Sequence, residues 1–517
     1  MREQLIYVPL LLLIISIYIF FVSTSYSLIK LNAAPYTHYQ YLTSAFLSGQ
    51  FNLPLSPSPQ LLKLKDPYDP KQNKFFRLHD ATLYNGKYYL YFGPLPVLAY
   101  FLPFKLLTGF YPSEASAVLF FLSLSFLMGF ALLQKIKENY FPHVSESLLM
   151  FTGLILGFAN NAPFLLSRPK FYEAAIASAF CFTSFALYFL YHLLHNEFKF
   201  KYAFLFSLCL SLAIAGRPHF VLVCLILIPL VFIYLYQRIN KTLRLQLFIS
   251  LLLPFVCIGL LLVTYNYLRF HSLIEFGQNY QLASINTTTT GLFSGTFHRN
   301  IPPGVFNYFL KPYSFLTTFP YIDFSTFNLV PPDSPYFFEM SAGVLLTAPF
   351  ILFILTLPSQ FEFHFKKNHQ AWFPLLWFIL FMMTIPLTTS LFLVTISGGT
   401  QRYETDFLPY LVFISILGFW LLNNYPLKQS TLSMIKIFFT IAGLISIYIG
   451  LALGMREWFL VPINFTVGQY SCLFYMDRFV MLSTLSVSLY LLIRIYQLDL
   501  SFYRYSTSKT LSWNQHE

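Results

Sequence analysis

Apolar residues fill long blocks of this chain, and short polar segments separate the blocks. Runs of about 18 or more apolar residues are typical of helices that cross a bilayer, and we place twelve of them. They cover residues 6–28, 114–134, 147–166, 173–194, 202–217, 219–236, 245–265, 341–358, 371–394, 406–423, 434–453 and 478–496. The pattern therefore predicts an all-α polytopic membrane protein with about 12 transmembrane helices, in which residues 1–517 form a single transmembrane domain.

One further apolar block, "LYNGKYYLYFGPLPVLAYFLPFKLLTGF" at 83–110, is left out of that count. Its uncharged core between Lys87 and Lys105 has 17 residues, which is about 25 Å as an α-helix, whereas the hydrocarbon core is about 30 Å thick. Three prolines interrupt it and would bend or break a helix, and its tyrosines favour the membrane interface. We therefore expect a juxtamembrane helix that lies in, or partly enters, the outer leaflet.

The basic residues bear on the sidedness of the loops, together with the shortness of 83–110. An extracellular N-terminus with thirteen spans, 83–110 among them, would satisfy the charges as well. With 83–110 outside the count and a cytoplasmic N-terminus, the basic residues fall in alternate connections, as the positive-inside rule requires. They are Lys135, Lys137, Lys199, Lys201, Arg238, Lys241, Arg244, Lys366, Lys367 and Lys428, with Arg494 at the end of the last span and Arg504 and Lys509 after it. Both termini are therefore expected in the cytoplasm, with a first external loop at 29–113 and a second at 266–340.

Composition supports the prediction of a membrane protein and argues against several other functions. The chain is 56% hydrophobic and 10% charged, with a mean hydropathy of +0.61, whereas a soluble domain has about 25% charged residues. The positive-inside rule explains the net charge of +12 without a nucleic-acid partner. The five cysteines have no paired spacing, so neither a disulfide framework nor a zinc site is indicated. A P-loop, GxSxG or HExxH motif is absent from the sequence, which argues against ATP hydrolysis, serine hydrolysis and zinc proteolysis.

The first loop carries the carboxylates that could act as a base. Residues 35–51 read as an amphipathic helix that ends at Gly49, and the proline-rich stretch 56–89 reads as an ordered loop. The acids of the loop are Asp66, Asp69 and Asp80. Asp80 is the main candidate, because it comes shortly before the juxtamembrane segment and is the acid expected to be held closest to the membrane. A turn or cap carboxylate is the alternative for it.

Several polar groups are expected at the level of the external loops. Arg217 lies between two spans that have almost no loop between them, and could hold a phosphate or simply extend to the surface. Arg168 and Lys170 in "LSRPKFYE", and Arg402 in "GGTQRYETDF", are placed at the same depth. Sugar or acceptor contacts are expected from Glu275 and Asn279 in the second loop and from Tyr89, because aromatic faces with polar neighbours suit sugars.

The arrangement of a first span, an amphipathic helix and a proline-aromatic segment resembles the GT-C superfamily of integral-membrane glycosyltransferases. Its members include protein O-mannosyltransferases and lipid A aminoarabinose transferases. "YLTSAFLSGQFNLP" looks like the helix after their first span, and "GKYYLYFGPLPVLAYFLPFKLLTG" looks like their segment of Pro, Tyr and Leu. "YNYLRFHSLIEFGQNYQL" and "QRYETDFLPYL" look like stretches of uncharacterised bacterial members.

The resemblance implies an inverting transfer of a sugar from a polyprenyl-phosphate donor to an envelope glycan, lipid or protein, at the outer face of a bacterial plasma (inner) membrane. A carboxylate would act as the base, while basic groups, or a divalent cation, would steady the phosphate. This chain departs from the family pattern because residues 33–38 hold no acid where the family has an acidic pair. Either Asp80 takes the role, or Asp66, Asp69 or His38 does, or the chain does not catalyse. A lipid-linked sugar flippase and a non-catalytic assembly protein of the same fold are the alternative functions.

Overall fold

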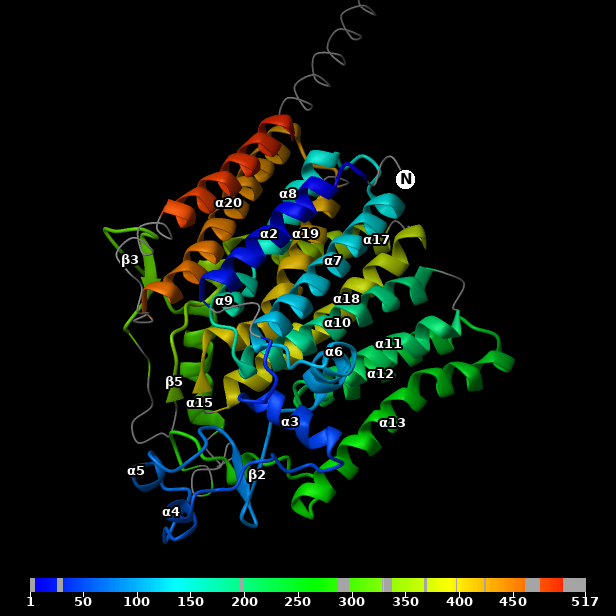
Figure 1. The fold of residues 1–517 in the computed structure, drawn as a ribbon. Helices are drawn as coiled ribbons and strands as arrows, with labels where there is room; N and C mark the ends of the chain where they lie inside the picture. The colour runs from blue at the N-terminus through cyan, green and yellow to red at the C-terminus, as the bar shows by residue number, and fades with distance from the viewer. Residues whose placement is uncertain are drawn as a thin grey trace, which may run out of the picture.

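The computed structural model describes residues 5–25, 31–195, 199–286, 288, 297–327, 329, 337–366, 370–396, 398–422, 425–460 and 475–495. Lys367, Arg504 and Lys509, which support the predicted topology, lie outside these ranges. The chain forms one bundle of tilted helices with small loop structures at the end away from the N-terminus (Figure 1). The prediction of an all-α polytopic membrane protein is confirmed.

Each of the twelve predicted spans contains helix. Six helices are long and apolar enough to cross a membrane by length and composition, and shorter apolar helices occupy most of the other spans. The helices are α2 (Val8–Ser25), α7 (Glu114–Tyr140), α8 (Glu146–Phe158), α9 (Ala162–Ser167), α10 (Phe171–His195), α11 (Phe200–Ile214), α12 (Phe220–Tyr236), α13 (Arg244–Phe270), α18 (Phe373–Thr395), α19 (Leu408–Leu422), α20 (Gln429–Leu460) and Tyr475–Ile495.

Two of the predicted spans are not single helices. In 147–166 the chain breaks between α8 and α9, where the side-chain oxygen of Asn160 accepts a hydrogen bond from the backbone N–H of Ala162 at 2.8 Å. In 341–358 it forms α16 (Val344–Thr347), a 3₁₀ helix (Pro349–Thr356) and the start of α17 (Leu357–Lys366). Pro349 lacks the N–H that a continuous helix needs, so α16 ends before it.

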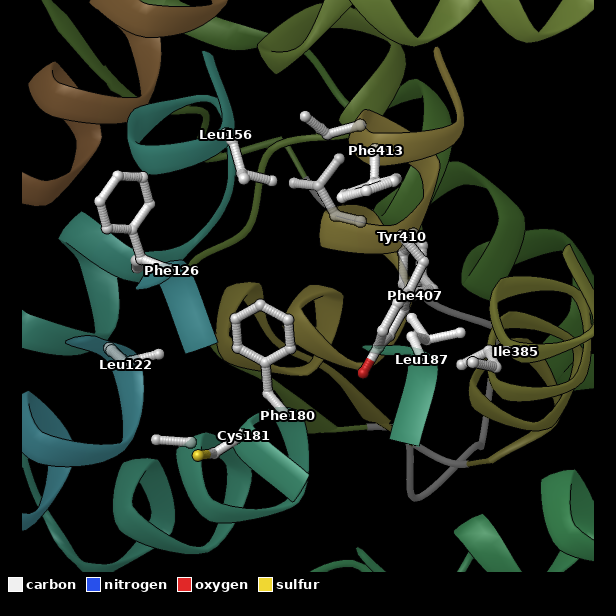
Figure 2. Close-up of a cluster of buried hydrophobic side chains, with 14 of the residues drawn as sticks. Leu122, Phe126, Leu156, Phe180, Cys181, Leu187, Ile385, Phe407, Tyr410 and Phe413 are labelled. Atoms are coloured by element: carbon white, nitrogen blue, oxygen red, sulfur yellow. The ribbon is translucent and has the colours of Figure 1, made fainter. Parts of the chain in front are cut away.

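Helix α10 lies at the centre of the bundle, against α7 and α11 (Figure 1). In the most apolar 18 residues of α10, 78% of the residues are buried, whereas in those of α13, at the edge of the bundle, 17% are buried. Helix α13 therefore exposes most of its apolar side chains. Figure 2 shows part of the core, where Phe126 of α7, Phe180 of α10 and Tyr410 of α19 come from helices far apart in sequence. This packing fixes the ends of α10 and α19, between which the polar groups gather.

The first loop begins with α3 (His38–Leu47), a helix inside the predicted stretch 35–51, and Gly49 follows its end with a φ of 68°. Two single turns follow, α4 (Pro59–Leu62) and α5 (Pro70–Asn73). Strands β1 (Thr82–Tyr84) and β2 (Lys87–Tyr89) then pair as an antiparallel hairpin. Asn85 and Gly86 both have positive φ, as a tight two-residue hairpin turn requires.

The juxtamembrane block therefore divides into two parts. Its beginning is the hairpin, which was expected to be loop, and its end is a π-helical turn (Val97–Phe101) continued by α6 (Leu102–Thr108). At 12 residues this helix is about 18 Å long and too short to cross a bilayer alone. The side of the membrane on which the two loops lie stays a prediction.

The second loop contains a 3₁₀ turn (Gln278–Tyr280), α15 (Phe297–Val305), a π-helical turn (Phe306–Leu310) and a hairpin of β3 (Tyr313–Phe315) and β4 (Ile322–Phe324). Its last strand β5 (Phe337–Phe338) pairs in parallel with β6 (Gly398–Gly399). This pairing brings Glu339 beside the 3₁₀ helix η7 (Gln401–Asp406), which precedes α19. Short 3₁₀ turns also precede α13 (Lys241–Leu243) and α18 (Gln370–Trp372).

Candidate functional site

The two loops are joined at Asp80. Its backbone N–H donates to the carbonyl oxygen of Leu282 at 3.1 Å, and the N–H of Leu282 donates to the carbonyl oxygen of Ala81 at 2.9 Å. Asp80 has a φ of 58°, a left-handed conformation that few residues other than glycine, asparagine and aspartate adopt readily. The junction therefore fixes where the Asp80 side chain points.

Both oxygens of the Asp80 carboxyl group are held by side chains distant in sequence. The amide nitrogen of Gln281 donates to Oδ1 at 2.9 Å, and the hydroxyl of Tyr172 donates to Oδ2. The ring nitrogen Nε2 of His79 lies 3.4 Å from Oδ2. The Asp80 side chain is 11% exposed, so the carboxyl group is oriented but still reaches solvent.

Tyr172 connects Asp80 to a buried arginine. The guanidinium of Arg402 lies over the Tyr172 ring at 4.4 Å, within the range of a cation–π contact. Its Nη2 donates to Oε1 of Glu339 at 2.8 Å, and its Nη1 lies 3.6 Å from Oε1 of Glu173. Burial opposes the charge on Arg402, but Glu173 and Glu339 raise its pKa above the usual value.

Arg217 forms a second cationic centre nearby. Its Nη2 donates to Oδ2 of Asp406 at 2.5 Å, and Nε2 of His219 lies 3.3 Å from the same oxygen. The guanidinium groups of Arg217 and Arg402 both lie over the ring of Tyr403, at 4.6 Å and 5.6 Å. Tyr403 therefore brings the two arginines to one place.

The two arginines keep unused hydrogen-bond donors. Arg217 is 9% exposed and Arg402 is 4% exposed. Among the described residues, neither Nε of Arg217 nor Nε and Nη1 of Arg402 has a hydrogen-bond partner. Buried donors are almost always satisfied in folded proteins. These N–H groups therefore leave room for a further acceptor, although the charges of both arginines are already paired with carboxylates.

Other predicted residues border this cluster. Nε of Arg168 lies 3.9 Å from Oε1 of Glu173, and the backbone N–H of Lys170 donates to Oε2 of Glu173 at 3.1 Å, with the Lys170 side chain exposed. His38 contacts the carbonyl oxygen of His79 at 2.9 Å and stacks on Phe171 at 4.1 Å. Burial lowers the pKa of His38 below its usual value.

The remaining predicted residues do not join the cluster. Asp66 accepts from the backbone of Tyr68 and from the amide of Asn286, each at 2.9 Å. Asp69 caps α5 by accepting from the Lys71 N–H at 2.9 Å, and this hydrogen bond lowers the pKa of Asp69. Asp69 therefore serves a turn, which is the role that the alternative interpretation gave to Asp80, and Asp66 serves a turn and a link to the second loop.

The predicted sugar-contacting residues are engaged locally as well. Glu275 accepts from the Gly277 N–H and from the Asn279 amide, both at 2.6 Å. Tyr89 packs against Phe270 with ring centres 5.4 Å apart. These contacts place them at the junction of the hairpin with the second loop.

The sequence interpretation missed Tyr172, Tyr403, Gln281 and Glu339 as members of the cluster. Tyr172 and Tyr403 each stand beside a residue that had been noticed for its charge, but tyrosines are common throughout this chain, with 37 in all. Gln281 and Glu339 reach the cluster only through the loop pairings. Within the described residues, no three His, Cys, Asp or Glu side chains group so as to hold a metal ion, and the divalent cation stays a prediction.

No family model and no curated protein matches the chain. Two solved structures are similar to it. The crystal structure of ArnT from Cupriavidus metallidurans bound to undecaprenyl phosphate has 12% identity and a TM-score of 0.43, over 95% of this chain and 75% of ArnT. The Archaeoglobus fulgidus oligosaccharyltransferase in its apo form has 13% identity and a TM-score of 0.36, over 90% of this chain and 59% of that one.

At this identity and with TM-scores below 0.5, neither protein assigns a substrate or a residue role to this chain. The case for a function rests on the cluster around Asp80 and the two arginines.

Proposed function

We propose that this protein is a membrane glycosyltransferase that moves a sugar from a polyprenyl-phosphate donor to a hydroxyl group of an envelope acceptor. One observation carries the proposal. The buried Arg217 and Arg402 both contact the ring of Tyr403 and keep unused N–H donors. Tyr172 contacts Arg402 with its ring and the oriented carboxylate of Asp80 with its hydroxyl. An anion site and a base side by side are what glycosyl transfer from a phosphate requires.

The arginine pair is the proposed site of the donor phosphate. Guanidinium groups bind phosphate with charge-assisted hydrogen bonds, often two at a time. Arg217 and Arg402 would hold the phosphate at the membrane surface, and Arg168 and Lys170 would add positive charge at its edge. A lipid tail fits this placement because the cluster lies at the ends of apolar helices α10, α11 and α19.

Asp80 is the proposed base. Its carboxylate takes the proton of the acceptor hydroxyl as that oxygen bonds to the anomeric carbon of the sugar. The bond between the anomeric carbon and the phosphate oxygen breaks, and the phosphate leaves with the electron pair. Arg217 and Arg402 stabilise the added negative charge on the phosphate, and the proton remains on Asp80. Attack from the side opposite the phosphate inverts the anomeric centre.

The other candidates take secondary places in this proposal. His38 lies close enough to support Asp80 through His79, whereas Asp66 and Asp69 are occupied by turns. Glu275, Asn279 and Tyr89 remain candidates for contacts to the acceptor or sugar, since they lie on the loop junction that carries Asp80. The cytoplasmic termini and the plasma membrane location also belong to the proposal, as does a divalent cation.

The test uses purified protein in nanodiscs with a radiolabelled polyprenyl-phosphate sugar. We expect Asp80→Asn to abolish transfer while donor binding persists, and the matched variant Asp69→Asn to transfer normally. Arg217→Gln and Arg402→Gln should weaken donor binding, whereas Arg269→Gln should not. Arg269 is a suitable control because it is buried but bonds to the Leu90 carbonyl oxygen at 2.7 Å, outside the cluster.

The outcomes separate the competing functions. Movement of the donor between leaflets without transfer would replace the proposal with a flippase. Neither binding nor transfer by the wild-type protein would favour a non-catalytic assembly role. Full transfer by Asp80→Asn would remove Asp80 as the base even if the enzyme function stood.

A further inference from the structure

The stretch 56–89 of the first loop is basic, with six basic and three acidic residues. Four of the basic residues have exposed side chains on and around α4 and α5, and we refer to them as the lysine cap. They are Lys63, Lys65, Lys71 and Lys74. A fifth exposed lysine, Lys87, stands at the turn of the neighbouring hairpin.

The acids among the cap lysines, Asp66 and Asp69, offset only part of the positive charge of the cap, because four lysines face two carboxylates. The carboxylates of Asp66 and Asp69 accept hydrogen bonds from backbone and amide N–H groups, and Asp80 belongs to the site. Within the described part of the chain, no ion pair involves any of the four lysines. Arg77 differs from them, because it bonds to the Asn73 side chain and to the Ala283 carbonyl oxygen.

The cap lies where a large soluble molecule can reach it. Figure 1 shows α4 and α5 at the end of the molecule opposite the N-terminus, beyond the ends of α2 and α9. Phe75 is 85% exposed and sits under the ammonium of Lys74, with 5.8 Å from nitrogen to ring centre. An exposed ring beside exposed cations presents a stacking face together with charge.

The location makes the charge notable, because external loops of membrane proteins are usually poor in lysine. The same stretch of chain leads directly from the cap to Asp80, because only residues 75–79 lie between Lys74 and Asp80. An acceptor held by the cap would therefore arrive close to the proposed base.

We infer that the lysine cap is the docking surface for the acceptor, and that the acceptor is an acidic glycan chain carrying carboxylate or phosphate groups. The inference rests on the proposed function and adds the chemical class of the acceptor. The lysines attract the acidic groups, Phe75 offers a face to a sugar ring, and the chain end enters between the loops toward Asp80.

The test is a binding measurement with the full-length protein in phosphatidylcholine nanodiscs. The probe is a fluorescent oligogalacturonate, and a maltodextrin of the same length is the neutral control. Combining Lys63→Gln, Lys65→Gln, Lys71→Gln and Lys74→Gln should weaken oligogalacturonate binding by at least about tenfold, since each lysine contributes to attraction of an anionic surface. Added salt should weaken wild-type binding, because exposed charges are screened.

A matched variant changes four exposed lysines at the opposite end, with Lys199→Gln, Lys201→Gln, Lys241→Gln and Lys428→Gln. It should bind the probe as the wild type does. Unchanged binding in the cap variant would overturn the inference. The inference would also be overturned if the cap variant changed binding only in nanodiscs that contain phosphatidylglycerol, because the cap would then be a contact for anionic lipid.

Two further measurements keep this inference apart from the proposed function. Polyprenyl-phosphate binding should be the same in the cap variant and the wild type, which also shows that the variant is folded. If Arg217→Gln and Arg402→Gln leave donor binding intact, the proposed function fails while the glycan binding result stands. Labelling of Lys74→Cys only from the cytoplasm would place the cap on the wrong side and overturn the inference.

Discussion

Replacing Arg402 tests whether the buried cluster serves ligand binding or only the fold. Arg402 is 4% exposed and neutralises Glu173, which is 0% exposed. In Arg402→Gln the Glu173 carboxylate stays buried and keeps only Arg168 as a cation nearby, with Nε 3.9 Å away. Breaking a buried ion pair from one side costs about 3–5 kcal/mol. We therefore expect the free energy of unfolding in detergent to fall by about that amount.

The double variant Arg402→Gln with Glu173→Gln removes both charges together. Because the stranded carboxylate is then absent, most of the loss should be recovered, with a coupling energy of about 2–3 kcal/mol. Glu339, the other carboxylate partner of Arg402, is 29% exposed and can be hydrated without a cation. The matched control is Arg402→Gln with Glu362→Gln, which should recover nothing because Glu362 pairs with Lys366 on the surface.

Two measurements on the same proteins decide the matter. Denaturant titration in micelles gives the stability, and binding of a radiolabelled polyprenyl phosphate gives the ligand function. We expect the double variant to be stable but still unable to bind the lipid phosphate. If it binds as well as the wild type, Arg402 is structural and the phosphate role is wrong. If it is no more stable than Arg402→Gln, the stranded-charge explanation is refuted.

Three other outcomes follow from single groups. Tyr172→Phe keeps the ring under Arg402 but removes the hydroxyl that holds Asp80, the candidate base. Steady-state kinetics should therefore show kcat lower by about 10–100-fold with donor binding unchanged. A parallel loss of donor binding would contradict this expectation. Burial lowers the pKa of Lys311 to about 8 from 10.5. The unfolded chain then binds a proton that the folded chain lacks between these pH values, so stability should rise with pH there, and Lys311→Met should flatten the rise. A Cβ at Gly93 would collide with a backbone carbonyl at the end of α11, so Gly93→Ala should destabilise the protein by about 1–3 kcal/mol, whereas Gly259→Ala in open space on α13 should not.

Local patterns predicted the helices because each helix depends mainly on its own residues. The 3.6-residue periodicity and Gly49 were enough to place α3, and apolar length was enough to place α7, α10 and α18. The exceptions had local causes that outweighed apolar length. Pro349 divides the helix expected at 341–358, and the Asn85–Gly86 turn makes a hairpin of a stretch rich in tyrosine.

The site could be predicted only in part, because its contacts join segments far apart in sequence. Charged residues are rare in an apolar chain, so Asp80, Arg217 and Arg402 could be found from their positions in the sequence alone. Their neighbours could not, since Tyr172 is 92 residues and Gln281 is 201 residues from Asp80. Nothing in the sequence around Asp66 or Asp69 distinguishes them from Asp80. The difference is that Asp69 bonds to its own turn and Asp66 bonds to its own turn and to Asn286, whereas Asp80 is held by Tyr172 and Gln281.

The charge balance of the cluster indicates how a phosphate would enter it. Arg217 and Arg402 are already paired with Asp406, Glu173 and Glu339, so an incoming anion must compete with a carboxylate. The side chains of Asp406 and Glu173 are 2% and 0% exposed, and either would be stranded in a dry site if displaced. Glu339 is 29% exposed and can move into water at little cost. A phosphate bound as proposed would therefore replace Glu339 on Arg402 first. Because the Glu339 backbone is bonded to Gly399, donor binding would then act directly on the end of the second loop.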